Sequence, residues 1–520
     1  MNDIWVTFAI LLLAVVAFVW NRIPVGIVAI GVALALYLTG VLDFEQTLAG
    51  FGDPVIVFIA ALFVVSEGLD ATGVTTWAGQ QLVQRAGTDR RRLVTLVMIL
   101  VAIVTALISV NGAVAALVPM VVVLCIRVKQ VPSQMLMPLA FGAHAGSLLV
   151  LTGTPVNVLV SELAADAGAR PIGFFEFGLV GLPLVVGTIL IVVLFGPRLL
   201  PRREADHVPR DLSAHAQTIA TQYSLPDVTG LLNRETGLTE VVVPPRSSFV
   251  GETVFPGMVT DSGDLVVVAI QRAGEDLGQT ELASGDVMLL RGTWDALDLN
   301  TADPNVVVVD APQTIRSQAV PLGPRAGYAI AVLVAMVVML ATGIVPPAIA
   351  ALIAACAMVL LRVLSVSQAQ RSISWTTLIL VGGMIPLSTA ITTSGAAELL
   401  ANGLVEAVGA SSPYLLLLGI AVVTAVLGQL ISNMATALIV APIAIAIATE
   451  TGISPLPLLM GVAVAAAASF LTPVATPANT MVMGPGGYRF GDYWKLGLPL
   501  LVLFVAVATL LVPVIWPFHP

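Results

Sequence analysis

The run Leu151-Thr152-Gly153-Thr154-Pro155-Val156-Asn157 returns 322 positions later as Pro473-Val474-Ala475-Thr476-Pro477-Ala478-Asn479. Each run interrupts a long apolar segment, at 135–167 in the first case and at 457–485 in the second. Proline removes a backbone donor and frees an upstream carbonyl. In hydrocarbon such a free group costs several kcal/mol, so a helix breaks there only inside protein or beside a cavity. The two runs therefore predict two equivalent broken helices.

The same offset extends far beyond the two runs. It aligns residues 24–157 with 346–479, and it places Pro24 on Pro346 and Gly73 on Gly395. A helix-rich apolar chain built twice, with matching polar interruptions, is typical of a secondary transporter whose substrate site lies near the middle of the bilayer. No nucleophile–base set and no metal-ligand cluster stands out in the sequence, so we do not expect an enzyme.

Composition excludes a soluble globular protein. The 520 residues are 58% hydrophobic and only 10% charged, with a mean hydropathy of +1.00. The net charge is −9, but residues 203–320 contain 7 Arg and 17 Asp or Glu, which alone give −10. The acidity therefore belongs to this segment and says nothing about the charge of a substrate.

Apolar segments predict an all-α polytopic membrane protein with five spans and one hairpin in each half. The first membrane repeat is 1–200 and the second is 323–520, with spans near 4–20, 24–40, 54–70, 135–167 and 178–196, then 325–343, 346–362, 375–392, 457–485 and 496–516. The hairpins, at 93–126 and 413–449, have arms too short for full spans and polar tips at 109–112 and 432–433. Polar stretches at 43–50 and 365–372 match each other and predict helices on the membrane surface.

Charge gives the orientation of the hairpins. Arg90, Arg91 and Arg92 precede the first hairpin, and Arg127 and Lys129 follow it, which places both of its ends on the cytoplasmic side. The second hairpin is flanked by acidic residues instead: Glu398, Glu406 and Glu450. We therefore predict inverted repeats in the inner (plasma) membrane, with both termini extracytoplasmic and the segment between the repeats cytoplasmic.

That segment, 201–322, predicts a linker followed by a small soluble α/β domain at about 238–312. Alternating residues predict strands at 239–243, 264–270, 286–291 and 305–310. The runs Val250-Gly251-Glu252-Thr253-Val254 and Ser284-Gly285-Asp286-Val287 resemble the TrkA-C domain, the ligand-sensing module of potassium-conductance regulators. The resemblance implies a domain that dimerises and can bind a small ligand. The alternative is a structural appendage without a ligand.

Spacing links each hairpin tip to the break in its own half. Asn111 precedes Thr154 by 43 residues, and Asn433 precedes Thr476 by the same 43. Freed carbonyls with hydroxyl and amide oxygens suit Na⁺, and half-helix N-termini attract anions. We therefore expect two half-sites that face each other. The alternative is that these residues only kink and pack the helices.

The polar tips and the Thr-Pro-x-Asn breaks resemble the divalent anion/Na⁺ symporter (DASS) family, which transports dicarboxylates, citrate or sulfate. The resemblance implies a homodimer in which a transport domain moves against a scaffold like an elevator. It implies the following Na⁺ ligands: Ser109, Asn111, Gly153, Thr154, Ser432, Asn433, Ala475 and Thr476. The implied substrate-binding residues are Asn111, Gly112, Asn157, Asn433, Met434, Thr476, Pro477 and Asn479. Gly112 and Met434 replace a tip Thr that helps to hold a carboxylate in the family, and a one-residue ambiguity remains at the first tip.

His144 is the one strongly titratable side chain well inside a predicted span, and Ala466 is its partner at the offset of 322. It could couple transport to protons, touch an anion, or pack as a neutral residue. The leading hypothesis is a Na⁺-coupled importer of a small oxyanion, sulfate first and dicarboxylate second. The alternatives are a proton-coupled carrier or exchanger that uses His144, and a ligand-gated channel. We expect Na⁺ as the coupling ion, no other metal or cofactor, and no nucleic-acid partner.

Overall fold

The protein is described here from a computed structural model of the 520-residue chain. It describes residues 2–519 except 21, 75–76, 79–80, 82–88, 129, 204–221, 224–235, 261, 302, 310–311, 313–322, 324 and 409–411. Most of the predicted linker therefore lies outside the described residues. The chain forms two compact units, one comprising Met1–Asp70, Gln81–Val208 and Gly327–Pro520, the other Ala71–Gln80 and Pro209–Ala326.

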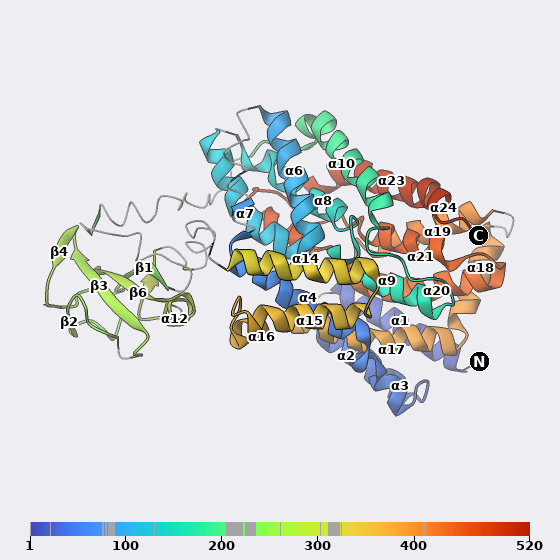
Figure 1. The fold of residues 1–520 in the computed structure, drawn as a ribbon, viewed down its shortest axis with the longest axis horizontal. Coiled ribbons are helices and arrows are strands. Elements are labelled where there is room, and N and C mark those ends of the chain that lie inside the picture. The colour runs from blue at the N-terminus through green and yellow to red at the C-terminus, as the bar shows by residue number, and fades with distance from the viewer. Residues whose placement is uncertain are drawn as a thin grey trace. The chain divides into compact units, whose positions relative to one another are not determined.

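The first unit is helical (Figure 1). The helices of the first half are α1 (Asn2–Trp20), α2 (Val25–Leu38), α3 (Phe44–Ala49), α4 (Pro54–Ala71), α6 (Arg90–Leu107), α7 (Val110–Arg127), α8 (Leu136–Gly146), α9 (Pro155–Asp166) and α10 (Gly178–Leu199), with short 3₁₀ turns η1 (Gly50–Gly52), η2 (Pro132–Gln134) and η3 (Leu151–Gly153). Those of the second half are α14 (Ala326–Thr342), α15 (Pro347–Leu360), α16 (Val366–Ser372), α17 (Trp375–Thr393), α18 (Ala396–Val408), α19 (Pro413–Leu427), α20 (Asn433–Thr451), α21 (Pro455–Ala466), α22 (Pro477–Met483), α23 (Tyr493–Ala506) and α24 (Val512–Ile515), with turns η4 (Phe490–Asp492) and η5 (Val507–Leu511).

Several of these helices are apolar enough to cross a membrane. Among the described residues, six helical segments have the required length and hydropathy: Asp3–Trp20, Phe44–Ala71, Gly178–Leu199, Trp375–Thr393, Asn433–Thr451 and Phe490–Ile515. The segments predicted to break are divided into shorter helices, α8 and α9 in the first half and α21 and α22 in the second. Three hairpin arms are longer than the sequence predicts: α6 and α7 have 18 residues each, and α20, with 19, is itself one of the six segments. The fold is therefore mostly helical, with the apolar helices of a polytopic membrane protein.

The two short polar helices begin with the same capping box. In α3 the Asp43 side chain accepts from the Gln46 N–H, and the Gln46 side chain accepts from the Asp43 N–H. In α16 Ser365 and Gln368 make the same reciprocal pair, 322 positions later. Each pair satisfies two backbone donors that a helix start leaves free. The repeat is thus visible in local hydrogen bonds as well as in the order of helices.

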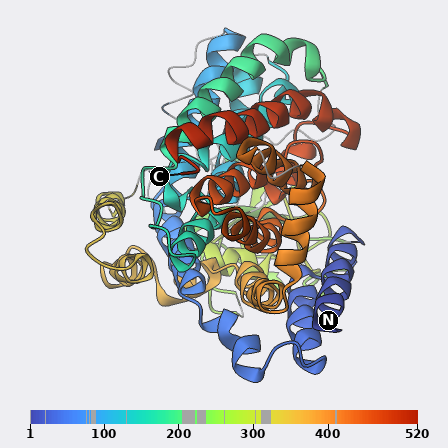
Figure 2. The same cartoon turned by 90° about the vertical axis from the view of Figure 1, so that its right-hand side faces the viewer.

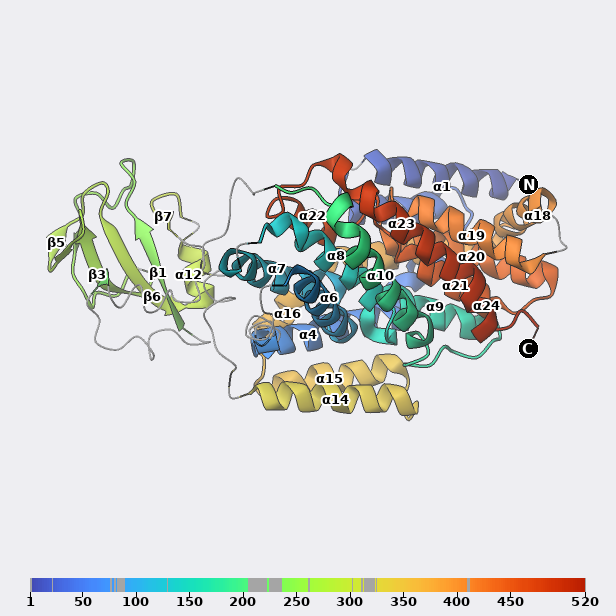
Figure 3. The ribbon, with the colours of Figure 1, turned by 90° about the horizontal axis from the view of Figure 1, so that it is seen from above.

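The broken helices lie at the centre of the helical unit. Every residue of α8 is buried. Helix α8 packs against α6 so closely that a Cβ on Gly146 would lie 2.4 Å from the Ala102 Cα. Helix α21 is buried along most of its length. By contrast, α14 and α15 lie side by side in every view and form an edge of the helical unit in Figures 2 and 3.

The second unit contains a five-stranded antiparallel sheet in the order β4-β3-β6-β1-β7. Its strands are β1 (Thr236–Val242), β3 (Leu265–Arg272), β4 (Glu275–Leu277), β6 (Val287–Thr293) and β7 (Val307–Val308), and a separate pair joins β2 (Thr253–Val254) to β5 (Thr280–Glu281). Helix α12 (Trp294–Asn300) follows β6 and adds Trp294 and Leu297 to the core. The four predicted strands correspond to β1, β3, β6 and β7.

Candidate functional site

An asparagine closes each break with the same pair of hydrogen bonds. The Asn479 side-chain amide donates to the Ser469 carbonyl at 2.8 Å and to the Thr472 carbonyl at 3.0 Å. In the first half the Asn157 amide donates to the Ser147 carbonyl at 2.9 Å and to the Val150 carbonyl at 3.0 Å. In each half, one of these bonds reaches ten residues back along the chain and the other reaches seven residues back. The motif asparagines therefore hold the two non-helical loops in the same conformation.

In the second half, the hairpin tip is bonded to the break by two polar side chains. Ser469 Oγ lies 2.6 Å from Asn433 Oδ1 and 3.0 Å from the Gly428 carbonyl. Gln429 donates to the Ala468 carbonyl at 2.8 Å and accepts from the Leu471 N–H at 2.8 Å. The predicted pairing of this tip with its break is therefore present in the structure.

Within the described part of the chain, the first tip has fewer hydrogen bonds to its break, and its register differs from the offset of 322. Thr152 Oγ1 donates to the Ala106 carbonyl at 3.3 Å. Ser109 Oγ accepts from the Gly112 N–H, three residues on, as Ser432 Oγ accepts from Ala435. The two serines therefore correspond at an offset of 323.

The new offset changes which residues match at the tips. Val110 takes the place of Asn433 at the start of its helix, and Asn111 matches Met434. Asn111 is exposed, whereas Met434 is buried. The one-residue ambiguity at the first tip is thus resolved, and the structure does not bring Asn111 into a bonded contact with the first break.

His144 joins the two halves. Its Nε2 lies 3.1 Å from Thr476 Oγ1 and 3.3 Å from Asn479 Oδ1, both at the second break. The Asn479 amide nitrogen already donates to two carbonyls, so the atom facing the ring is an acceptor and Nε2 must carry the hydrogen. The imidazole is fully buried and stands edge-on to the Phe470 ring, with centroids 5.8 Å apart.

The remaining predicted residues differ between the halves. Thr476 caps α22 by accepting from the Asn479 N–H, whereas Thr154 makes no side-chain cap at α9. A Cβ on Gly153 would lie 2.3 Å from the Ser147 carbonyl oxygen, while the second half carries Ala475 at that place. Two further predicted residues are placed simply: Pro477 begins α22, and a Cβ on Gly112 would lie 3.8 Å from Ser66 Oγ of α4.

Sequence reasoning missed three polar residues at the second break. They are Gln429 and Ser469, described above, and Tyr493, whose hydroxyl donates to the Asn479 carbonyl at 2.7 Å. Ser469 could have been found, because it matches Ser147 at the offset of 322. Gln429 and Tyr493 have no polar counterpart at that offset, so the repeat carries no signal for them.

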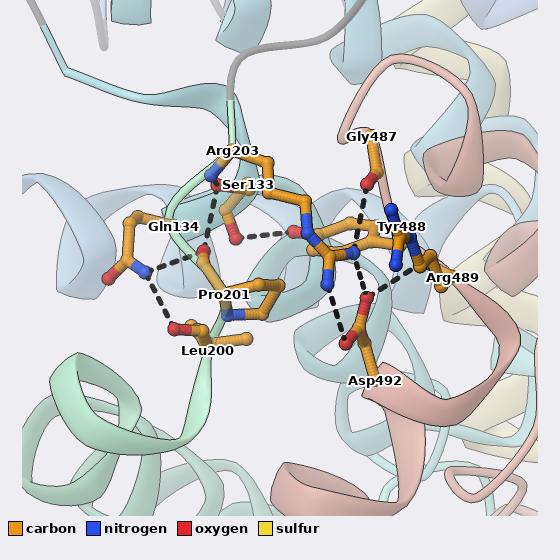
Figure 4. A network of polar contacts seen from close by, with 9 residues as sticks. All are labelled: Ser133, Gln134, Leu200, Pro201, Arg203, Gly487, Tyr488, Arg489 and Asp492. Atoms are coloured by element: carbon orange, nitrogen blue, oxygen red, sulfur yellow. Dashed lines mark hydrogen bonds and ion pairs between the residues drawn. The ribbon is translucent and has the colours of Figure 1, made fainter.

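A second polar network lies at the foot of α8 (Figure 4). The guanidinium of Arg203 forms an ion pair with Asp492, and its backbone N–H donates to Ser133 Oγ at 3.0 Å. Tyr488 donates from its hydroxyl to the Ser133 carbonyl at 2.6 Å and accepts from the Met137 N–H at 2.8 Å. These bonds connect the end of the first half with the loop that follows α22.

Among the described residues, no three or more His, Cys, Asp or Glu side chains come together in a way that could hold a metal ion. The oxygens that do converge come from main-chain carbonyls, threonine, serine and asparagine. They suit a hard monovalent cation better than a transition metal.

Comparison with known proteins identifies the family. The citrate transporter family matches residues 15–448 and 407–519 of this chain. The uncharacterised transporter YfbS of Escherichia coli (strain K12) is 31% identical over 608 residues, which cover 99% of this chain and 99% of YfbS. Sodium/sulfate cotransporter 2 of Chlamydomonas reinhardtii is 26% identical over 300 residues, covering 54% of this chain and 32% of that protein.

A solved structure shows the same fold. The crystal structure of the YdaH transporter of Alcanivorax borkumensis matches with a TM-score of 0.51 at 16% identity, covering 98% of this chain and 100% of that one. The family match and the apolar helices lead to one conclusion. This chain is a multi-pass membrane protein of the citrate transporter family.

Proposed function

We propose that this protein is a Na⁺-coupled symporter of a small oxyanion, with sulfate the first candidate and a dicarboxylate the second. The coupling ion binds where a hairpin tip meets the break of its own half. The observation that carries this proposal is the bonding of the second tip to the second break through Asn433, Ser469 and Gln429. Main-chain, hydroxyl and amide oxygens gather there without a carboxylate, which favours a monovalent cation.

We take the substrate to be an anion because one helix begins at the first break and another at the second tip. Helices α9 and α20 begin at Pro155 and Asn433, and their first backbone N–H groups carry partial positive charge. The names of the relatives agree with an oxyanion substrate, since one relative is a sodium/sulfate cotransporter and the family is that of citrate transporters. Met434, which follows Asn433 in α20, is buried, and a side chain larger than the threonine of the resembled family at this place supports a small substrate.

The repeats are inverted and the protein works as a homodimer by an elevator motion. Support comes from the repeated order of helices, from the matched breaks and from opposite charges at the two hairpins. In this arrangement the second unit (Ala71–Gln80 and Pro209–Ala326), called the β-rich unit from here on, is cytoplasmic, and both termini are extracytoplasmic. The β-rich unit serves as a TrkA-C-like module that binds a small ligand.

Radiolabelled sulfate uptake into proteoliposomes, with and without an inward Na⁺ gradient, tests the function. Succinate and citrate are added as competitors. We expect gradient-driven uptake that Asn433→Ala abolishes, while Thr342→Val, an exposed change at the end of α14, leaves it intact. Single-channel currents in planar bilayers would contradict the symporter proposal and show that the protein is a channel.

The contact of His144 with the second break supports one alternative, a proton-coupled carrier or exchanger. This alternative would be established if uptake does not depend on Na⁺ but is driven by a pH gradient, and if His144→Gln abolishes the pH dependence. Uptake with unchanged pH dependence in His144→Gln would exclude it.

A further inference from the structure

Asn479 is hydrogen-bonded through each of its polar groups. The side-chain amide donates to two carbonyls of the loop, and the main-chain N–H donates to Thr476 Oγ1 at 3.4 Å. The main-chain carbonyl accepts from the Tyr493 hydroxyl at 2.7 Å. The remaining atom, Oδ1, lies 3.3 Å from His144 Nε2. These bonds fix the orientation of the amide, so that Oδ1 faces the ring as an acceptor.

The imidazole of His144 acts here as a neutral donor. Its Nε2–H is shared by two oxygens, Thr476 Oγ1 at 3.1 Å and Asn479 Oδ1 at 3.3 Å. Its Nδ1 is buried and has no hydrogen-bond partner in the described part of the chain. A proton added at Nδ1 would form a buried N–H without an acceptor, which is unfavourable. The ring is therefore suited to orient its two oxygen neighbours and not to carry a proton.

The two donors that face Thr476 decide what its hydroxyl can bind. A hydroxyl has two lone pairs that accept and one hydrogen that donates, and the hydrogen rotates to suit its partners. Oγ1 accepts from the Asn479 N–H as the cap of α22 and also faces the Nε2–H of His144. No described residue accepts the hydroxyl hydrogen, and Thr476 is 7% exposed, close to the exposed Val474 and Pro477. The Thr476 O–H is therefore available to a ligand at the surface of the break.

The first half lacks the imidazole donor. The offset of 322 that carries Asn479 to Asn157 carries His144 to Ala466, whose methyl group cannot donate a hydrogen bond. Asn157 Oδ1 accordingly accepts no hydrogen bond from any residue that the structure describes. The arrangement of imidazole, threonine and asparagine thus belongs to the second half, although the Thr-Pro-x-Asn motif is common to both.

We infer that His144 is a positioning residue for the transported oxyanion: its Nε2–H occupies the acceptor sides of Thr476 Oγ1 and Asn479 Oδ1, and so directs the Thr476 O–H toward a substrate oxygen. A hydrogen bond from a hydroxyl to an ionised oxygen is short and strong. An ionised oxygen only accepts, so this donor favours an anion that has lost its protons. The inference rests on the proposed function and deepens it, and it leaves the coupling ion where the second tip meets its break.

Two pairs of variants test the inference in the full-length protein. Initial rates of radiolabelled sulfate uptake into proteoliposomes are measured against sulfate concentration under a fixed inward Na⁺ gradient, with succinate as the probe if that is the anion transported. Thr476→Val removes the hydroxyl and Thr476→Ser keeps it, whereas His144→Leu removes the donor and His144→Gln keeps an N–H on its side-chain amide. We expect Thr476→Val and His144→Leu to raise the KM about tenfold or more, and the two conservative variants to stay within about threefold of the wild type.

Three further readouts separate positioning from a general effect on folding. The Na⁺ concentration that gives half-maximal uptake at saturating substrate should stay within about threefold in every variant. Combining His144→Leu with Thr476→Val should raise the KM no further than either single change, because both act on the same hydroxyl. The pH dependence of uptake between about pH 5 and 8 should be the same in His144→Gln as in the wild type.

Several results would overturn the inference. A KM that His144→Leu leaves unchanged, or additive changes in the double variant, would show that His144 does not act through Thr476. A pH dependence that is lost in His144→Gln would make His144 a proton carrier instead. If His144→Leu is not monodisperse, the Thr476 pair decides, because an equal KM in Thr476→Val and the wild type would exclude the hydroxyl as a substrate contact. With Na⁺-driven uptake by the wild-type protein intact, these results leave the proposed function standing, whereas absence of that uptake for sulfate, succinate and citrate would remove both.

Discussion

The two breaks share a motif but differ in how it is completed. In both breaks an asparagine amide donates to two main-chain carbonyls of the loop, one ten and one seven residues earlier in the chain. The second break is further fixed by His144, Ser469 and Gln429, whereas the buried Asn157 Oδ1 of the first accepts no hydrogen bond from any described residue. Duplication thus gave two copies of one scaffold, and single substitutions such as His at 144 against Ala at 466 gave them different chemistry.

Removing the two motif asparagines gives the largest expected contrast. Asn479→Ala loses two donated hydrogen bonds and leaves the buried Nε2 of His144 without its amide acceptor. We expect it to lower the free energy of unfolding by roughly 2–4 kcal/mol. Asn157→Ala loses the two donated bonds but also removes an unpaired oxygen, so its cost should be smaller. Urea unfolding in detergent, followed by circular dichroism, measures both, and equal losses would contradict the asymmetry.

A glycine–alanine exchange tests the packing of the breaks. Gly153→Ala places a Cβ 2.3 Å from the Ser147 carbonyl oxygen, a main-chain atom that the Asn157 amide holds. We expect a loss of about 1–3 kcal/mol in unfolding free energy, as is usual for overpacking. Ala475→Gly, the reciprocal change, should cost less because it removes one methyl group. Thermal unfolding of both variants decides this, and a milder effect of Gly153→Ala would show that the first loop yields easily.

Two matched serines compare the links between tip and break. Ser469→Ala removes the contact with Asn433 Oδ1, and we expect a loss of about 1 kcal/mol together with faster amide exchange at residues 428–436. Among the described residues, Ser147 Oγ donates to the His144 carbonyl alone, three residues earlier in α8. Ser147→Ala should therefore leave exchange at the first tip near the wild-type rate. Hydrogen exchange with mass spectrometry reports both, and similar changes at the two tips would remove the distinction.

The smallest expected effect is a difference in pH dependence between the β-rich unit and the two breaks. Asp286 is buried, and hydrogen bonds from the Arg272 guanidinium and the Ala283 N–H hold its pKa below the usual value. Because the pKa of Asp286 is lower in the folded than in the unfolded state, its ionised carboxylate stabilises the unit at pH values above the unfolded pKa of about 4. This stabilisation is lost as the pH falls through the folded pKa. After correction for the intrinsic exchange rate at each pH, the protection of residues 236–308 from hydrogen exchange should fall below that pH, while the protection of the breaks, which contain no carboxylate, should not change.

Asp286→Asn is the control for that pH effect. It removes the titrating group, so exchange in the β-rich unit should be faster at neutral pH and change less on acidification. An unchanged acid response in this variant would assign the effect to other carboxylates of the unit.

The sequence pattern predicted the apolar spans and the two breaks, because apolar length and proline position are local properties. It also identified Asn157 and Asn479, whose motif is repeated. It did not predict helix α18 or the length of the hairpin arms, and re-entry of the hairpins stays a prediction. The register of the first tip could not be predicted from the sequence. The structure aligns the two tips by the serine caps, Ser109 and Ser432, and not by Asn111 and Asn433. The contact of His144 with Thr476 could not be predicted, because it depends on how helices 332 residues apart in sequence pack together.

The network around Arg203 sets a practical boundary for dissecting the chain. Residues 201–203 follow the last helix of the first half, yet Pro201 accepts from Ser133 Oγ and Arg203 pairs with Asp492 of the second half. These three residues therefore fold as part of the helical unit, whatever happens to the segment after them. A shortened protein without the β-rich unit should retain the chain through Arg203, because a cut before Pro201 would remove one side of the joint between the two halves.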